Sequence, residues 1–171
     1  MRWAVKAGDI LDEPVDVLVC SANVFLNLSG GVGGAILLRY GDPMQRELHE
    51  TLARRGKRFA QRGDLVVTSP CGTPYKAVIH AVAVDGFYQS SPEVVRGLIE
   101  ASLERAAAMR ARRVALTALA TGHGRMSMRD FAGAIEPLVG REWPPIEEVV
   151  ICVRNSSDTG IIAGECCLLD G

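Results

Sequence analysis

Six short apolar runs recur along the chain, separated by polar and glycine-rich stretches. The run at residues 15–20 is apolar at nearly every position, a pattern typical of a strand that is buried on both faces of a sheet. The other runs are similarly short, which favours strands over helices. The predicted strands lie at about residues 2–7, 15–20, 64–68, 76–84, 113–119 and 148–153.

Helical patterns occupy several of the gaps between these runs. The pair Asp42-Pro43 predicts a helix start, because proline is well placed in a first helical turn. The buried face of this helix is expected to carry Met44, Leu48 and Leu52. A second helix is predicted to begin at Ser91-Pro92. Its buried stripe is expected to consist of Val95, Leu98, Ile99, Ser102, Leu103 and Ala106.

Two further helices are predicted in the last third of the chain. Ser127 and Asp130 have the spacing of a capping box, which indicates a helix that runs toward Leu138. Only a short helix is expected between residues 158 and 169, because this stretch contains two glycines and each disfavours a helix by about 1 kcal/mol relative to alanine.

Alternating strands and helices indicate an α/β fold, with a largely parallel sheet between layers of helices. The runs at 64–68 and 76–84 are joined by the turn-like sequence of residues 70–74, which suits an antiparallel pair. We therefore expect a mixed sheet in a three-layer α/β/α sandwich. Residues 1–171 contain no linker-like stretch or repeat, so we expect a single domain.

A glycine-rich segment follows the predicted strand at 15–20. Asn23 stands near the end of that strand, and four glycines occupy residues 30–34 before the helix-like residues 35–38. A strand, a glycine loop and a helix start together present backbone N–H groups to an anion, most often a phosphate. The alternative is a tight turn in which glycine only relieves crowding. Four glycines within five positions favour the phosphate site.

A second glycine segment lies at residues 120–125, after the predicted strand at 113–119. In a parallel sheet both segments would open at the carboxyl edge, where they could hold a diphosphate from two sides. Asp9 follows the first strand and is either a turn former or an acceptor for an adenine amino group. The sequence contains neither the dinucleotide fingerprint nor a P-loop, which argues against an ordinary dehydrogenase or a P-loop ATPase.

The overall composition and net charge limit the kinds of ligand that the chain is expected to bind. The chain of 171 residues has 48% hydrophobic and 23% charged residues and a net charge of −1, so no overall field attracts a polyanion. The basic run at residues 54–58 is interpreted as favourable charge at a helix C-terminus.

Five cysteines without metal or redox spacing suggest a reduced, cytoplasmic protein. We expect no metal, no cofactor, no signal peptide and no membrane-spanning segment. His80 is interpreted as a structural histidine and His49 as an exposed one.

The order of these motifs resembles the macro domain, a module that binds ADP-ribose. The resemblance covers about residues 3–153. It rests on Gly8-Asp9-Ile10, the stretch 15–23, the stretch 30–36, Gly63-Asp64, the stretch 78–82 and the stretch 121–124. It implies a six- or seven-stranded mixed sheet between helices, and a cleft for ADP-ribose or for an ADP-ribosyl group on a protein.

The resemblance also implies a role for each matching residue. Asp9 would bind the adenine amino group, Ile10 would line the adenine pocket, and Arg154 would stack on the adenine in place of the family's aromatic residue. Asn23 would hydrogen-bond the hydroxyls of the distal ribose. The diphosphate and distal ribose would be surrounded by Gly30, Gly31, Val32, Gly33, Gly34, Ala120, Thr121, Gly122, His123 and Gly124.

Several departures from the family pattern bear on catalysis. Members that hydrolyse ADP-ribosyl groups often carry Asp where this chain has Gly33, and viral-type members often carry His where it has Leu28. Asn23 and His123 are the remaining catalytic candidates, since asparagine can orient a water and histidine can act as a base near neutral pH. We therefore expect a monomeric binding module. The alternative is a weak, substrate-assisted hydrolase of mono-ADP-ribosyl groups or O-acetyl-ADP-ribose, and binding of adenine-rich RNA is disfavoured by the balanced charge.

Overall fold

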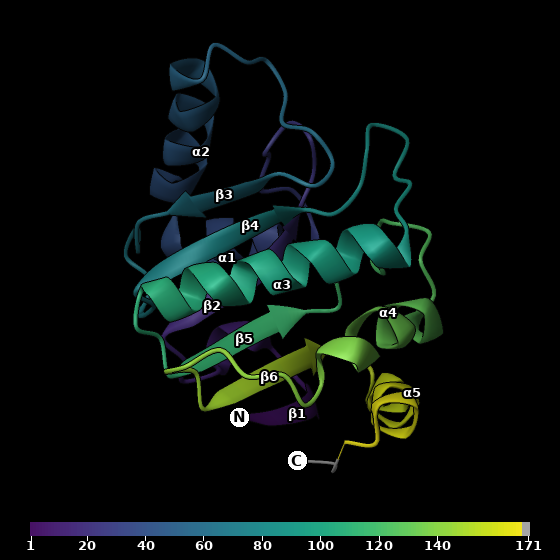
Figure 1. Cartoon of the computed structure of the whole chain (residues 1–171). Helices are drawn as coiled ribbons and strands as arrows, with labels where there is room; N and C mark the ends of the chain where they lie inside the picture. Colours follow the sequence, from purple (N-terminus) through teal and green to yellow (C-terminus); the bar gives the residue numbers. More distant parts are fainter. Residues whose placement is uncertain (169–171) are drawn as a thin grey trace.

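A six-stranded mixed sheet forms the centre of the computed structural model, which describes residues 1–168 (Figure 1). The strand order is β1-β6-β5-β2-β4-β3. Five strands run parallel, and β3 pairs antiparallel with β4 at one edge. The strands are β1 (Arg2–Ala7), β2 (Val17–Ala22), β3 (Leu65–Thr68), β4 (Ala77–Val82), β5 (Arg113–Thr117) and β6 (Glu148–Val153).

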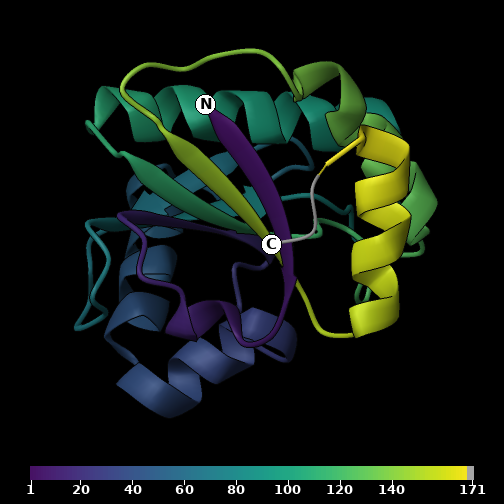
Figure 2. The same cartoon turned by 90° about the horizontal axis from the view of Figure 1, so that it is seen from below.

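Helices cover both faces of this sheet, and each face has its own hydrophobic core. In Figure 2 the sheet lies between the long helix α3 above and helices α1 and α2 below. One layer contains η1 (Ile10–Asp12), α1 (Gly31–Tyr40) and α2 (Pro43–Arg54). The other layer contains α3 (Pro92–Ala108), α4 (Met128–Ile135), η2 (Glu136–Leu138) and α5 (Ser156–Cys166).

The predicted elements are confirmed. All six expected strands are present, and β3 and β4 form the expected antiparallel pair. Helix α3 starts after its Ser91 N-cap, Ser127 and Asp130 form the capping box at the start of α4, and the buried faces of α2 and α3 are the predicted ones. The first four residues of β2, Val17–Cys20, are buried because helices pack on both sides of the sheet.

Several strand ends differ from the prediction by one or two residues, and two helix starts also differ. Helix α1 begins at Gly31, so most of the glycine-rich segment is a first helical turn rather than a loop. This helix start requires glycine, because Gly30 and Gly31 have φ of 66° and 50°, values that other residues rarely adopt. Helix α5 starts at Ser156, and the predicted helix end at Leu169 lies outside the described residues, as do residues 169–171 of the expected domain.

His80 is a buried structural residue, as predicted. Its Nδ1 lies 3.5 Å from Cys20 Sγ and its Nε2 lies 3.2 Å from Thr68 Oγ1, so both ring nitrogens have partners. Burial lowers the pKa of His80 to about 4, which keeps the imidazole neutral near pH 7. Within residues 1–168, no helix combines the length and the hydropathy needed to cross a membrane.

Glu148 links three parallel strands at their amino ends. It is 8% exposed and stands between Arg2 of β1 and Arg113 of β5 in the sheet register. Its carboxylate accepts a hydrogen bond from the Arg2 guanidinium and another of 2.7 Å from Arg113 Nε. Burial favours a higher pKa for Glu148, but the hydrogen bonds from the two arginines outweigh it and lower the pKa.

We predict that Glu148→Gln destabilises the fold by about 1–3 kcal/mol near pH 7, because two guanidinium groups lose a charged acceptor. The folded-state pKa lies below the usual value of 4.5, so this stabilisation exists above pH 4.5 and is lost as the pH falls. Urea unfolding of parent and variant at a series of pH values measures the difference, which should shrink in acid.

Glu147→Gln is the matched control for this experiment. Glu147 pairs with Arg112 at the neighbouring position, but their side chains are 58% and 67% exposed, so solvent screens the pair. An equal loss of stability in both variants would mean that burial of Glu148 contributes nothing.

Candidate functional site

A cleft of about 750 Å³ opens at the carboxyl ends of the five parallel strands. Its lining includes a residue within three positions of the end of each strand: Asp9 after β1, Asn23 after β2, Val84 after β4, Ala120 after β5 and Arg154 after β6. Ligands bind at this edge in open α/β sheets, because both faces of the sheet are covered by helices. The volume is in the usual range of small-molecule sites. The cleft is therefore the candidate functional site.

The start of helix α1 forms one wall of the cleft. Gly30, Gly31, Val32 and Gly33 line it, and the backbone N–H groups of a first helical turn have no partner within their own helix. A Cβ placed on Gly31 would meet nothing within 4 Å. Backbone N–H groups at a helix start, with no side chain in front of them, are suited to an anion.

Gly34 is the predicted site residue that the structure does not bring into the cleft. Its N–H donates to the Gly30 carbonyl at 2.9 Å, which is the first bond of the helix. The residue is also absent from the cleft lining. The expectation that Gly34 surrounds a ligand stays a prediction, and the chain has already turned into α1 at this position.

The second glycine segment forms the facing wall. Residues Ala120 to Gly124 all line the cleft. The segment folds tightly on itself, since a Cβ on Gly124 would lie 2.0 Å from the Ala120 carbonyl oxygen, and only glycine fits there. The two walls meet at His123, whose Cε1 would be 2.9 Å from a Cβ on Gly30. The imidazole therefore packs on the glycine backbone across the cleft.

Asp9 is held by two partners at one end of the cleft. Its Oδ1 accepts from the Leu11 N–H at 2.9 Å, which caps η1, and its Oδ2 accepts from the Arg39 guanidinium at 2.9 Å. Arg39 also pairs with Asp12 at 2.8 Å, so it ties α1 to η1. Asp9 is thus a capping residue, as the simpler interpretation held. Its side chain is still 43% exposed and lines the cleft, where it can accept a further hydrogen bond.

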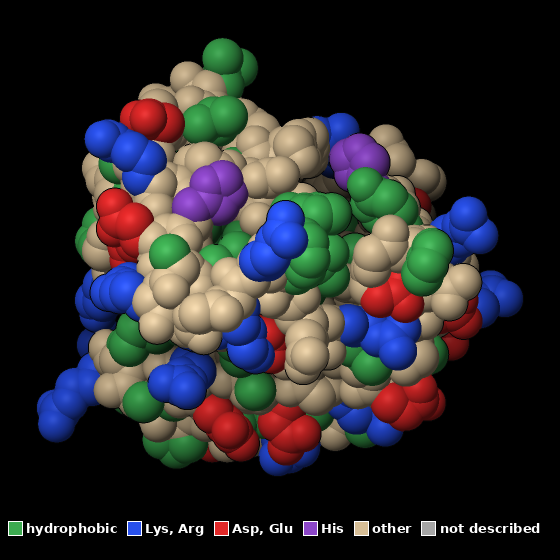
Figure 3. All heavy atoms as spheres, turned by 90° about the horizontal axis from the view of Figure 1, so that it is seen from above, with side chains coloured by type: hydrophobic (Ala, Val, Ile, Leu, Met, Phe, Trp, Pro, Cys, Tyr) green, Lys and Arg blue, Asp and Glu red, His purple; other side chains and the backbone are tan. Residues whose placement is uncertain are grey.

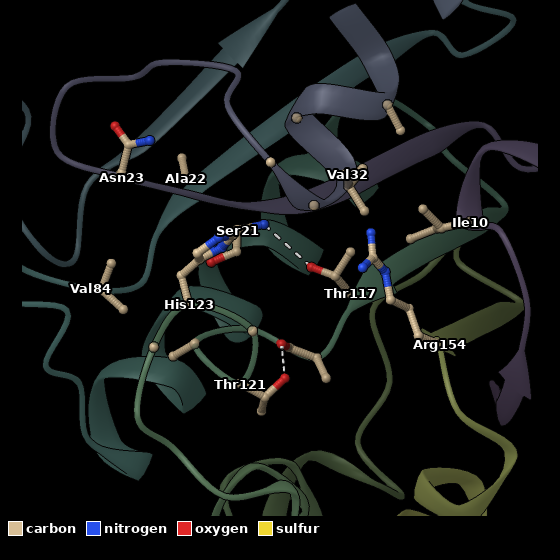
Figure 4. Close-up of a pocket in the computed structure, with 18 of the residues that line it drawn as sticks. Ile10, Ser21, Ala22, Asn23, Val32, Val84, Thr117, Thr121, His123 and Arg154 are labelled. Atoms are coloured by element: carbon tan, nitrogen blue, oxygen red, sulfur yellow. Dashed lines mark hydrogen bonds between the residues drawn. The ribbon is translucent and has the colours of Figure 1, made fainter. Parts of the chain in front are cut away.

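An apolar surface adjoins Asp9. Ile10 is buried and lines the cleft, and the Tyr75 hydroxyl lies 3.4 Å from its carbonyl oxygen. Figure 4 shows Arg154 reaching into the cleft toward Val32, beside Ile10. A flat guanidinium next to two aliphatic side chains can pack on the face of a planar ring.

Asn23 lies at the opposite end, on the side of Ala22 and Val84 (Figure 4). Its Oδ1 accepts from the N–H groups of Phe25 and Asn27 at 3.0 and 3.3 Å, and its Nδ2 donates to the Asn27 carbonyl at 2.9 Å. The Asn23 amide therefore closes the loop formed by residues 23–27. The expected contact of Asn23 with a ligand would have to share these groups.

A polar clamp from α2 holds the segment between Asn23 and the glycines. Gln45 Nε2 donates to the Leu26 carbonyl at 2.9 Å, and Gln45 Oε1 accepts from the Leu28 N–H at 2.6 Å. His49 Nε2 lies 2.9 Å from Asn27 Oδ1. His49 is exposed, as predicted. Its contact with Asn27 could not be predicted from the sequence, because the two residues are 22 positions apart and only tertiary packing brings α2 beside residues 26–28.

Other lining residues were also missed. Thr117 at the end of β5 accepts a hydrogen bond of 3.3 Å from the Ser21 N–H on the cleft floor. Tyr88 comes from the β4–α3 loop, and Asp158 comes from the first turns of α5. Lining residues at strand ends, such as Thr117, could have been predicted from the expected sheet topology. No local pattern marks Tyr88 or Asp158, because their positions depend on how a loop and a terminal helix pack.

The described lining of the cleft contains the cysteine Cys152 and no cluster suited to a metal. Burial raises the pKa of Cys152 to about 12, so this thiol stays protonated near pH 7. Among residues 1–168, no three His, Cys, Asp or Glu side chains come close enough together to hold a metal ion. The described lining offers backbone N–H groups, amides, hydroxyls, carboxylates, an arginine and the histidines His80 and His123.

Curated relatives match most of this chain. A protein of Thermotoga maritima is 33% identical over 164 residues, which is 92% of this chain but 27% of that protein. A macro domain-containing protein of Streptomyces griseus is 33% identical over 144 residues, 83% of this chain and 81% of that protein. The chain thus spans about a quarter of one relative and most of the other.

Solved macrodomains share the fold. A macrodomain variant from Oceanobacillus iheyensis, solved with ADPR, superposes with a TM-score of 0.82 at 20% identity over 94% of this chain and 89% of the other. A Trypanosoma brucei macrodomain in complex with ADP-ribose superposes with a TM-score of 0.78 at 20% identity, over 97% of this chain and 68% of the other.

The macro domain family model matches residues 19–135, which is more than half of the chain and contains both glycine segments. The fold, the curated relatives and this match agree, and the chain belongs to the macro domain family.

Proposed function

We propose that this chain binds ADP-ribose, free or attached to a protein, in the cleft at the carboxyl edge of the sheet. The observation that carries the proposal is the pair of glycine segments that face each other across the cleft and meet at His123 and Gly30. They lie between an apolar end with Asp9 and a polar end with Asn23. Two family members with the same fold were solved with ADPR and with ADP-ribose, which supports this ligand.

The proposed adenine site lies at the Asp9 end. The adenine ring would pack between Ile10 and the Arg154 guanidinium, and its amino group would donate to Asp9. Arg39 holds the Asp9 carboxylate in position and engages one oxygen at 2.9 Å. A carboxylate oxygen has two lone-pair directions, so this ion pair leaves room for a base.

The proposed diphosphate site lies between the two glycine segments. The N–H groups of Gly31, Val32 and Gly33 at the start of α1 would donate to the phosphate oxygens, and the positive end of the helix dipole would add to the attraction. The residues from Ala120 to Gly124 would enclose the diphosphate and the distal ribose from the other side. The distal ribose would lie toward Asn23.

Hydrolysis is expected to be slow or absent. The carboxylates among the described lining residues are Asp9 and Asp158, which follow the neighbouring strands β1 and β6. Asn23 follows β2 at the other end of the cleft, so no carboxylate in the described lining stands beside it. A general base for water would have to be His123 or an oxygen of the substrate.

We predict that the chain binds ADP-ribose more tightly than AMP, and that Gly31→Glu weakens ADP-ribose binding by at least about tenfold relative to Gly31→Gln. Both substitutions carry the same strain at φ 50° and point into open space, so they differ in charge only. The glutamate would repel the diphosphate. Isothermal titration calorimetry with both ligands measures the affinities.

The glutamine variant is the control for size and backbone strain. Equal affinities for ADP-ribose and AMP in the parent would show that the two glycine segments do not hold one ligand together. Equal affinities in the Glu and Gln variants would place the diphosphate away from the start of α1.

We predict that Asp9→Asn weakens ADP-ribose binding by about 1–3 kcal/mol, the usual cost of one lost polar contact to a base edge. It should also reduce the preference for adenine over hypoxanthine in the same ligand, because hypoxanthine lacks the amino group. Asparagine can still cap η1 through its oxygen, so the folded state should be kept. Titration of both ligands is the measurement.

Asp12→Asn is the matched control, because Asp12 is the second partner of Arg39 and does not line the cleft. Parent-like base selectivity in Asp9→Asn would make Asp9 a capping residue only.

We predict that turnover of O-acetyl-ADP-ribose or of ADP-ribosylated protein is slow or absent in the parent, and that any residual rate falls in Asn23→Ala and His123→Ala. General acid–base help is worth about 10²–10⁴-fold, so its loss would be plain in single-turnover rates at saturating substrate. Fast hydrolysis in the parent, unchanged in His123→Ala, would contradict both the binding-module proposal and this base.

Gly33→Asp tests whether a missing carboxylate limits the rate. A Cβ at Gly33 would lie 3.1 Å from Leu28 Cα, so the loop must shift slightly to accept the aspartate. ADP-ribose affinity of the variant is the control for that shift, and a rate increase at preserved affinity is the expected result.

A further inference from the structure

Exposed aromatic side chains gather beside the Asn23 end of the cleft. Phe25 is 50% exposed, Phe59 48%, Phe87 80% and Tyr88 49%. We call these four residues the aromatic rim. They include three of the four phenylalanines in the chain, and Tyr88 also lines the cleft. Exposed apolar side chains that gather in a patch often mark an interaction site.

The aromatic rim is carried by three segments that are far apart in the sequence and contact one another in the structure. The Ala60 N–H donates to the Val24 carbonyl at 2.8 Å, and the rings of Phe25 and Phe59 meet edge to face with centroids 5.2 Å apart. Arg62 pairs with Asp85 at 3.3 Å and donates to the Gln89 carbonyl at 3.3 Å. These contacts hold the segments at 23–25, 58–62 and 85–89 side by side.

The loop that carries Phe87 and Tyr88 is held in shape before any partner arrives. Asp85 Oδ1 accepts from the N–H groups of Phe87 and Gln89 at 2.9 and 3.0 Å. These backbone hydrogen bonds lower the pKa of Asp85, so the carboxylate stays charged. Tyr88 has a φ of 61°, an unfavourable value for a large side chain. A constrained loop that displays two aromatic residues indicates a preformed contact surface.

Positive charge borders the aromatic rim. Helix α2 ends at Arg54, and Arg54, Arg55, Lys57 and Arg58 are all exposed. Within residues 1–168, none of these four side chains forms an ion pair with a carboxylate, and the Arg58 guanidinium lies 5.9 Å from the Phe59 ring centroid. Arg54 lies in the last turn of α2, where a positive charge interacts favourably with the helix dipole. The helix dipole does not explain the positive charges of Arg55, Lys57 and Arg58, which follow the helix.

This charge is local to one part of the surface. The chain has a net charge of −1, and basic and acidic side chains are interspersed around the edge of the face in Figure 3. A cluster of unpaired cations next to aromatic rings has the composition of a protein interface with an acidic partner.

We propose that the aromatic rim and the basic residues at 54–58 dock an acidic segment of the protein that carries the ADP-ribosyl group. This inference rests on the proposed function. The group attached to the distal ribose leaves the cleft at the Asn23 end, and Phe25 is two residues from Asn23. The carrier protein therefore passes over the rim.

The geometry of the rings favours a polypeptide over RNA. Phe25 and Phe59 pack edge to face on each other, whereas bases stack on successive open ring faces. An acidic side chain can reach Arg58 while its neighbours contact the rings, which is the arrangement of an interface hot spot.

The test compares five ligands by titration: ADP-ribose, an ADP-ribosylated RNA oligonucleotide, and three peptides of equal length that carry the same ADP-ribosyl group at the same residue. One peptide is acidic, one has Gln in place of each Glu, and one is basic. The parent chain should bind the acidic conjugate at least about tenfold more tightly than free ADP-ribose, and the basic conjugate less tightly than the neutral one.

Phe59→Ala, Phe87→Ala and Arg58→Glu should each remove most of the gain shown by the acidic conjugate and leave the affinity for free ADP-ribose unchanged. Arg58→Glu should also reverse the order of the acidic and basic conjugates. Leu38→Ala is the control, because Leu38 is 90% exposed on α1 and lies outside the cleft lining and the rim. It should alter neither affinity.

The outcomes separate this inference from the proposed function. Failure to bind free ADP-ribose would overturn the proposed function. Binding of ADP-ribose with equal affinity for all three conjugates would overturn only the docking surface. A larger gain for an ADP-ribosylated RNA oligonucleotide than for the acidic peptide would also overturn it.

Discussion

Burial of the parallel strands on both faces is the constraint on which the rest of this structure depends. Residues 17–20 of β2 are buried, and so is every residue of β6. A strand enclosed in this way can present polar groups only where it ends. Five parallel strands end at one edge, so five chain segments bring their first loop residues to one cleft. The cleft follows from the topology, and its chemistry follows from those few residues.

The walls of the cleft are anchored to the helical layers rather than left as free loops. Gln45 on α2 clamps the backbone of Leu26 and Leu28, and Arg39 on α1 holds Asp9. His123 packs on the backbone of Gly30 and so links the two glycine segments. Each contact reduces the conformational freedom that a ligand would otherwise have to remove on binding. This organisation favours a site that recognises its ligand with little rearrangement.

The distribution of polar groups distinguishes binding from turnover. Backbone N–H groups without a helical partner are concentrated at the start of α1, and Asp9 offers a partly exposed carboxylate. The amide of Asn23 is shared with its own loop, and the carboxylates of the described lining lie at the β1 and β6 side. Tight binding needs only complementary contacts, whereas hydrolysis also needs a base placed at the reacting atom. The described cleft meets the first requirement more fully than the second.

Local patterns in the sequence determined the six strands, the buried faces of α2 and α3, the capping box of α4 and the two glycine segments. Each depends on residues close together in the chain, so periodicity and capping chemistry suffice to predict it. Only the tertiary structure decided that α1 begins within the glycines, that Gln45 and Arg39 support the cleft, and that the segments carrying Phe25, Phe59 and Phe87 are linked to one another. These features join segments tens of residues apart, and such pairings are set by the packing of whole layers, which no local pattern records.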